Sequence, residues 1–141
     1  MHRRLAHILT ALACGLALAG CERPGTRPDS GGAGADGADA FVKSLDSFTG
    51  ELLSKVESAA ETKAGVTEAQ ALLDARKADL SASVAALRQD AGAKRRLLEA
   101  EVENTDRVGR LRLKYADATA QDAELKAGLE RLINDYDAIF R

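Results

Sequence analysis

Apolar side chains recur every three or four residues from about Asp39 to Arg141, and no proline interrupts this stretch. In a helix of 3.6 residues per turn, this spacing places the apolar side chains on one face. The same stretch is rich in Ala, Leu, Glu, Lys and Arg, which all favour helices. The sequence therefore predicts an all-α fold for residues 39–141.

The first part of this stretch is predicted to be a helical hairpin. Asp39 is the predicted N-cap of the first helix, and Gly65 is its predicted stop. Thr67 and Gln70 have the spacing of a capping box that would start the second helix, which we expect to end at Gly92. Because only a few residues join the two helices, they should pack antiparallel. Their apolar stripes are Phe41, Leu45, Phe48, Leu52, Val56 and Ala59, and then Ala69, Leu73, Leu80, Val84, Leu87 and Ala91.

The remaining segment, residues 94–140, leaves two architectures open. A single helix of this length would measure roughly 70 Å and would expose its far half beyond the hairpin. A break near residues 117–121, where Thr119 and Asp122 hint at a new N-cap, would instead close a four-helix bundle, and we prefer this alternative. The prediction is thus a three- or four-helix bundle with coiled-coil-like packing. The apolar residues of the segment are Leu98, Val102, Val108, Leu111 and Tyr115, and then Leu125, Leu129, Leu132, Tyr136 and Ile139.

The first 21 residues carry a different pattern. Arg3 and Arg4 precede an uncharged apolar run, residues 8–18, which is the arrangement of an export signal. As a helix this run would extend roughly 16 Å, about half of the hydrocarbon thickness of a bilayer. It leads into the tetrapeptide Leu-Ala-Gly-Cys, residues 18–21. This tetrapeptide resembles the lipobox of bacterial lipoproteins, which implies that residues 1–20 are a signal peptide and that Cys21 is acylated.

The resemblance also implies a place in the cell envelope. Two or three acyl chains on Cys21 would hold the protein at the cell membrane or the outer membrane, facing the periplasm, because one chain alone binds only marginally. Glu22 follows the Cys in place of the Asp associated with inner-membrane retention, which favours the outer membrane. The small murein lipoprotein is similar in being an acylated, Ala- and Leu-rich helix. This chain ends in Arg141 rather than in the Lys that links that protein to peptidoglycan, so wall attachment is not expected.

The segment between the signal and the helices has the composition of a linker. Residues 22–38 contain both prolines and five glycines of the chain, and no Val, Leu, Ile or Phe. Such a segment cannot build a core. We therefore predict that residues 21–38 form a lipidated flexible tether with a span of roughly 23 Å.

The mature chain lacks most of the residues on which catalysis depends. Its 121 residues (141 minus 20) contain no His and no Trp, and its only Cys is the acylated one. This excludes disulfides, Ser-His and Cys-His nucleophiles, and zinc sites built on Cys or His. Carboxylates are numerous but scattered through helix-forming sequence. We therefore expect no enzyme, no catalytic residue, no metal site and no cofactor.

The charge distribution bears on the partner. The net charge changes from −2 to about −4 when Arg3 and Arg4 leave with the signal, and an anionic body does not favour nucleic acid as a partner. Arg107, Arg110 and Lys114 fall on one predicted helical face, where they could bind lipid phosphates, lipopolysaccharide or an acidic protein. The alternative is a solvated face whose charge is balanced by nearby acidic residues.

Two functional classes remain. The first is a membrane-anchored module for protein–protein interaction or assembly, whose partner is an envelope protein or a second copy bound through the C-terminal helical stripe. The second is a carrier or sensor of a small amphiphile or lipid bound between the helices. Tyr115, Tyr136 and Phe140 are interpreted as core or stripe residues rather than as a ligand box. The Ala-rich stripes favour the first class, because an amphiphile pocket needs a wide apolar interior.

Overall fold

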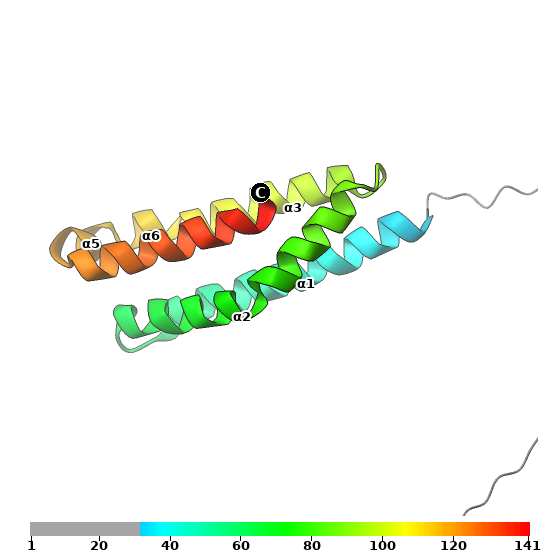
Figure 1. The fold of residues 1–141 in the computed structure, drawn as a ribbon. Helices are drawn as coiled ribbons and strands as arrows, with labels where there is room; N and C mark the ends of the chain where they lie inside the picture. Colours follow the sequence, from blue (N-terminus) through cyan, green and yellow to red (C-terminus); the bar gives the residue numbers. More distant parts are fainter. Residues whose placement is uncertain (1–31) are drawn as a thin grey trace, which may run out of the picture.

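Four antiparallel helical segments pack into a bundle in the computed structural model, which describes residues 32–141 (Figure 1). No strand occurs among these residues, so the all-α prediction is confirmed. The described side chains begin at Asp36. The elements are α1 Gly32–Ser58, α2 Thr62–Arg88, α3 Lys94–Gly109, α4 Leu111–Lys114, α5 Ala116–Gln121, α6 Ala123–Asp137 and the short 3₁₀ helix η1 Ala138–Phe140.

The first helix starts earlier than its sequence predicts. α1 begins at Gly32, so Asp39 lies inside the helix and its carboxylate pairs with Arg96 of α3 at 3.4 Å. Ala38, in the segment predicted as tether, is fully buried. The physical reason is that each residue added to an existing helix gains a hydrogen bond without a new nucleus, and no proline follows Pro28.

The turn between α1 and α2 differs from the predicted one. Gly65 lies in the first turns of α2 rather than at the end of α1. A Cβ atom at Gly65 would stand 2.6 Å from the backbone oxygen of Lys55 and 2.8 Å from the Cβ of Ala59. The glycine therefore allows α2 to pass close to the end of α1, and it does not act as a stop.

The predicted capping box is wrong as a helix start. α2 begins at Thr62, so Thr67 and Gln70 both lie within the helix. The Thr67 hydroxyl donates to the backbone oxygen of Lys63 at 2.9 Å, as a hydroxyl inside a helix commonly does. The N-cap residue, Glu61, makes no capping hydrogen bond with its side chain.

The turn that joins α2 to α3 matches the prediction more closely. α2 ends at Arg88, and Gly92 lies in the turn that follows. The carboxylate of Asp90 accepts hydrogen bonds from the backbone N–H groups of Gly92 at 2.7 Å and Ala93 at 3.1 Å. These bonds satisfy the amides ahead of α3, which would otherwise lack partners.

The C-terminal segment breaks as preferred. Tyr115 has φ −108° and ψ 19°, and the chain reverses through α5 to Asp122, whose backbone is extended. The Asp122 carboxylate caps α6 by accepting from the N–H groups of Glu124 and Leu125, both at 2.9 Å. The single long helix is therefore excluded, and the four-helix alternative is confirmed.

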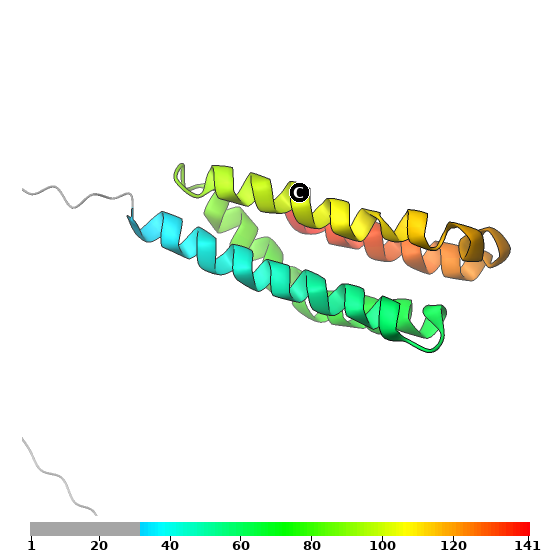
Figure 2. The same cartoon turned by 180° about the vertical axis from the view of Figure 1, so that it is seen from behind.

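The bundle is not uniform along its length. α1 packs against α2 and α3, and α6 closes the ring by packing against α2 and α3. α6 is short, so the C-terminus lies part-way along the bundle, and the second half of α2 turns toward α3 beyond it (Figures 1 and 2). Arg88 of α2 donates to the backbone oxygen of Phe140 where the path of α6 ends. One end thus holds four helices and the other holds three.

The core confirms most of the predicted stripes and corrects one. Leu45, Leu52 and Leu73 are fully buried, and the seam residues of α6 are buried as well, Tyr136 fully. On α3, however, the predicted stripe is wrong at Leu98 and Val102, which are 59% and 62% exposed. The buried residues of this helix and α4 are instead Leu97, Ala100, Asn104, Val108 and Leu111. None of the helices in the described range is both long and apolar enough to cross a membrane.

Candidate interaction surface

The exposed large apolar side chains gather on one face of the molecule. Among residues 36–141, the large apolar side chains with high exposure are Leu98, Val102 and Leu113, at 59%, 62% and 81%. At 100° per residue, all three lie within a narrow sector of the α3–α4 helix, with Thr105 and Gly109 between them. We call this set, Leu98, Val102, Thr105, Gly109 and Leu113, the outer stripe.

α3 therefore has two apolar faces. The inner one packs against α1 and α6, and the outer stripe faces away from them. Sequence reasoning found Leu98 and Val102 but assigned them to the core, and it missed Leu113. The adjacent pair Leu97 and Leu98 was the available signal, because two neighbouring leucines start two interleaved series of apolar residues.

Asn104 joins the inner face of α3 to α1. This fully buried side chain donates through Nδ2 to Asp46 Oδ1 at 2.8 Å and to the backbone oxygen of Ala100 at 3.0 Å. Its Oδ1 accepts from Arg107 Nη1 at 3.1 Å. The bond to Asp46 is the one that leaves α3, and it opposes rotation of α3 about its axis, since rotation would break it. This contact therefore keeps the outer stripe on the solvent-facing side of α3.

A second buried polar contact joins α1 to α6. Thr49 Oγ1 and the Tyr136 hydroxyl lie 2.6 Å apart, and both residues are fully buried. Thr49 uses its own hydrogen to donate to the backbone oxygen of Leu45 at 2.8 Å, so Tyr136 is the donor to Thr49. Burial raises the pKa of Tyr136 to about 12.

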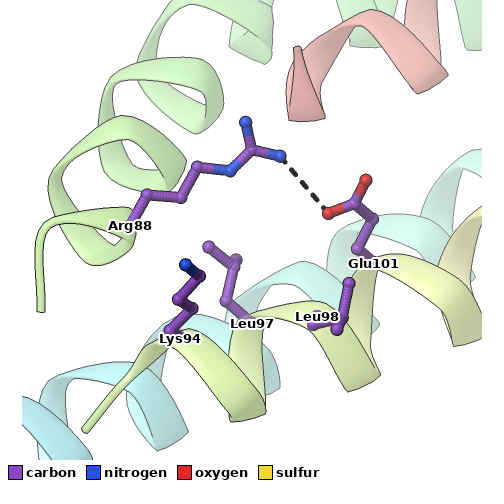
Figure 3. A pocket seen from close by; sticks show the side chains of 5 residues that line it. All are labelled: Arg88, Lys94, Leu97, Leu98 and Glu101. Carbon is purple, nitrogen blue, oxygen red and sulfur yellow. Dashed lines mark hydrogen bonds and ion pairs between the residues drawn. The ribbon is translucent and has the colours of Figure 1, made fainter. Parts of the chain in front are cut away.

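A shallow pocket borders the outer stripe near the α2–α3 turn. It encloses about 290 Å³ and is lined by Arg88, Lys94, Leu97, Leu98 and Glu101. Figure 3 shows Arg88 extending from α2 toward Glu101 of α3, and the two groups lie 3.3 Å apart. Leu98 belongs to both the pocket and the outer stripe. The exposed apolar surface thus extends sideways from the stripe toward α2.

The three basic residues predicted as a patch have partners inside the chain. Arg110 pairs with Asp106 at 2.6 Å on its own helical stretch. Lys114 pairs with Glu57 of α1 at 2.9 Å, and this hydrogen bond raises the pKa of the lysine. Arg107 is held by Asn104 as described above. The basic patch and the alternative of a solvated, balanced face both stay predictions.

The predicted lipidation residue, Cys21, lies outside the described residues, as do the signal peptide and most of the tether. Within the described range, no cluster of three or more acidic or His and Cys side chains is arranged to hold a metal ion. The comparisons with family models, curated proteins and solved structures gave no match for this chain.

Proposed function

We propose that this chain is a lipid-anchored protein of the bacterial envelope that acts as a non-catalytic module for protein–protein interaction or assembly. The observation that carries this proposal is the outer stripe, an apolar face of an already packed helix. Apolar side chains collected on one face of a soluble domain commonly mark a binding surface, whereas scattered ones do not. The anchor is supported by the lipobox-like tetrapeptide that ends at Cys21.

The fold is compatible with attachment through Cys21. α1 begins at the same end of the bundle as the α2–α3 turn (Figures 1 and 2). The chain from Cys21 to Gly32 can extend at most roughly 36 Å. A bundle anchored in this way stays near the membrane surface, where its outer stripe meets other envelope components at high local concentration.

An amphiphile carrier is less well supported. The interior of the bundle is occupied by large side chains, among them Leu45, Leu129 and Tyr136, which are essentially fully buried. The pockets found within the described residues are open hollows at the surface, such as the one beside Leu98. A single-chain amphiphile needs an apolar cavity that surrounds most of its surface. An interaction module needs only the exposed face that is present.

The anchor is tested by replacing the acylated residue. Cys21→Ala should abolish the incorporation of labelled palmitate and should release the chain from the membrane fraction or leave it as uncleaved precursor. The matched control is Cys14→Ala, which removes the other cysteine of the chain and should keep both label and membrane attachment. Labelled, membrane-bound Cys21→Ala protein would contradict the proposal.

The interaction role is tested separately in the anchored chain. A photo-crosslinking residue at Leu113 should give adducts of higher mass in the envelope, because this side chain is 81% exposed on the outer stripe. The same probe at Ala75, an exposed position of α2, is the control and should give far fewer adducts. Equal adduct yields at both positions would contradict a role for the stripe.

A further inference from the structure

We infer that the outer stripe pairs with the outer stripe of a second copy of this chain, with the two α3–α4 helices antiparallel. This inference rests on the proposed interaction role and names its partner. The chain's own linker cannot cover the stripe, since residues 22–31 contain no Ala, Val, Leu, Ile or Phe. The charges that flank the stripe and the sizes of its side chains instead favour a second copy of the chain.

Four charged side chains flank the outer stripe. Glu99 and Glu101 lie in the first half of the α3–α4 helix, which begins with the basic residues 94–96, and Arg110 and Arg112 lie in the second half, which also carries Asp106. Each of the four has an ion-pair partner within its own chain. At 100° per residue, Glu99 and Arg110 lie on one side of the outer stripe, while Glu101 and Arg112 lie on the other. Each side therefore has an acidic group toward one end and a basic group toward the other.

This pattern complements itself in only one orientation. In an antiparallel pair related by a two-fold axis, residues on the same side of the stripe face each other. Glu99 then lies near Arg110 of the second copy, and Glu101 lies near Arg112 of the second copy. A parallel pair would bring Glu99 near Glu101 and Arg110 near Arg112. Since like charges in contact are unfavourable, these four groups favour the antiparallel pair over the parallel one. The Asp106 carboxylates of the two copies then lie near the two-fold axis, each paired with Arg110 of its own chain.

The side chains of the stripe also complement one another by size. With the two-fold axis between Thr105 and Asp106, Leu98 lies opposite Leu113 and Val102 lies opposite Gly109. A Cβ atom at Gly109 would meet nothing within 4 Å in the chain, so open space is present where the valine of the second copy would pack. A helix–helix interface is filled without voids when large side chains of one helix face small ones of the other.

The pair is compatible with two anchors in one membrane. The first residues of the two α1 helices would lie at opposite ends of the pair, because α1 begins at the α2–α3 end of its own bundle. Each tether reaches at most roughly 36 Å, which exceeds the thickness of roughly 20 Å of two helix layers. Both acyl groups therefore reach the same membrane when the pair lies along its surface with the two-fold axis perpendicular to it.

The first test measures mass by sedimentation equilibrium. The protein is the mature chain, residues 21–141, with Cys21→Ser so that no acyl group is present. We expect a concentration-dependent dimer whose dissociation constant rises at least about tenfold in Val102→Glu. Ala75→Glu places the same charge on an exposed position of α2 and should leave the dimer unchanged. A monomer at every concentration would overturn the inference.

The second test exchanges charges across the predicted contact. Glu99 and Arg110 are exposed, and their ion pairs lie within their own helical stretch, with Arg95 and Asp106. Glu99→Arg and Arg110→Glu should each weaken the dimer by about tenfold, and the double variant should recover the affinity to within about threefold. A double variant as weak as the combined single variants would overturn the antiparallel register.

The third test uses introduced cysteines, since the Cys21→Ser chain has no other thiol. Leu98→Cys alone and Leu113→Cys alone should form no disulfide between chains after oxidation, whereas a mixture of the two should form a disulfide-linked dimer. Linkage of Leu98→Cys to itself would indicate a parallel pair and overturn the inference. If the chain is monomeric but the Leu113 probe still crosslinks to another envelope protein, the second copy is not the partner and the proposed interaction role stands. If the chain forms no dimer and the probe gives no crosslink, both the inference and the proposed interaction role are contradicted.

Discussion

Tyr136 of α6 donates its hydroxyl hydrogen to Thr49 Oγ1 of α1, over 2.6 Å in a fully buried setting. Tyr136→Phe should lower the free energy of unfolding by about 1 kcal/mol, because Thr49 keeps its bond to the backbone oxygen of Leu45 and no group is left without a partner. Urea denaturation measures the change. Tyr115→Phe is the control and should cost less, since the Tyr115 hydroxyl is only part-buried and lies 3.4 Å from its acceptor.

Tyr136 should also make the folded chain less stable at alkaline pH. The pKa of Tyr136 is raised to about 12 in the folded chain, mainly by burial, against about 10 in an unfolded chain. Its stabilising contribution is therefore complete below pH 10 and is lost as the pH rises from about 10 to 12. Absorbance titration of phenolate should show a step near pH 12 that Tyr136→Phe abolishes. Persistence of that step in the variant would contradict the assignment.

Gly65 should be far less replaceable than a glycine in open space. Gly65→Ala places a Cβ atom 2.6 Å from the backbone oxygen of Lys55, so α1 and α2 must separate, and we expect a loss of about 2 kcal/mol of unfolding free energy. Gly37→Ala is the matched control within α1, where a Cβ atom meets nothing within 4 Å. There we expect a gain of about 0.5–1 kcal/mol, because alanine favours the helix. Thermal or urea denaturation distinguishes the two, and equal effects would contradict the close approach.

Asp122 should stabilise the start of α6, the fourth helix of the bundle. Asp122→Ala removes a carboxylate that accepts from two backbone N–H groups at the start of α6, and such a cap contributes about 1 kcal/mol. The loss should appear in chemical denaturation and in faster hydrogen exchange of the first turn of α6. Asp117→Ala, in α5, is the control and should be close to neutral. Unchanged exchange at Glu124 and Leu125 would argue against the cap.

Asp135 should contribute to the loss of stability in acid. Its pKa is lowered, first by the hydrogen bond from Lys77 Nζ at 2.8 Å and also by bonds from Gln70 and Arg131. A lowered carboxylate pKa means that the contribution is present above the ordinary value of about 4 and is lost as the pH falls through the folded value. Asp135→Asn should therefore be less stable than the parent chain at pH 7.

The acid test compares the two proteins across pH. Their denaturation midpoints should converge as the pH falls through the lowered pKa of Asp135 in the folded chain, because the carboxylate of the parent chain then also becomes neutral. The exposed Asp117→Asn is the control and should follow the parent chain at every pH. A constant difference between Asp135→Asn and the parent chain from pH 7 to pH 2 would show that the effect is not one of charge.

The helical stripes of α1, α2 and α6 could be predicted from sequence because each contains one dominant apolar series. Leu45 and Leu52 in α1, and Leu73 and Leu80 in α2, are buried as their spacing predicts. The break before α6 could be anticipated as well, because Asp122 is a good N-cap residue where the preceding α5 stretch lacks large apolar side chains. The lipidation residue and the basic patch stay predictions that these contacts do not test.

The parts that could not be predicted depend on contacts between distant residues. Gly65 could be a helix stop or a point of close approach, and only the position of Lys55 and Ala59 against it distinguishes the two. The interaction surface was missed for a related reason. Leu97 and Leu98 begin two apolar series of similar strength, and periodicity alone cannot rank them.

The sequence by itself determined the all-α class, the antiparallel hairpin and the inward faces of three helices, because a periodicity of 3.6 residues is a local property of the chain. The tertiary structure decided which face of α3 is buried. Asn104 reaches Asp46 of α1 only when Leu97 faces the core, and a buried amide that lacks a partner is costly. That choice places Leu98 and Val102 outside, and so the packing of α3, rather than its sequence pattern, creates the surface on which the proposed function depends.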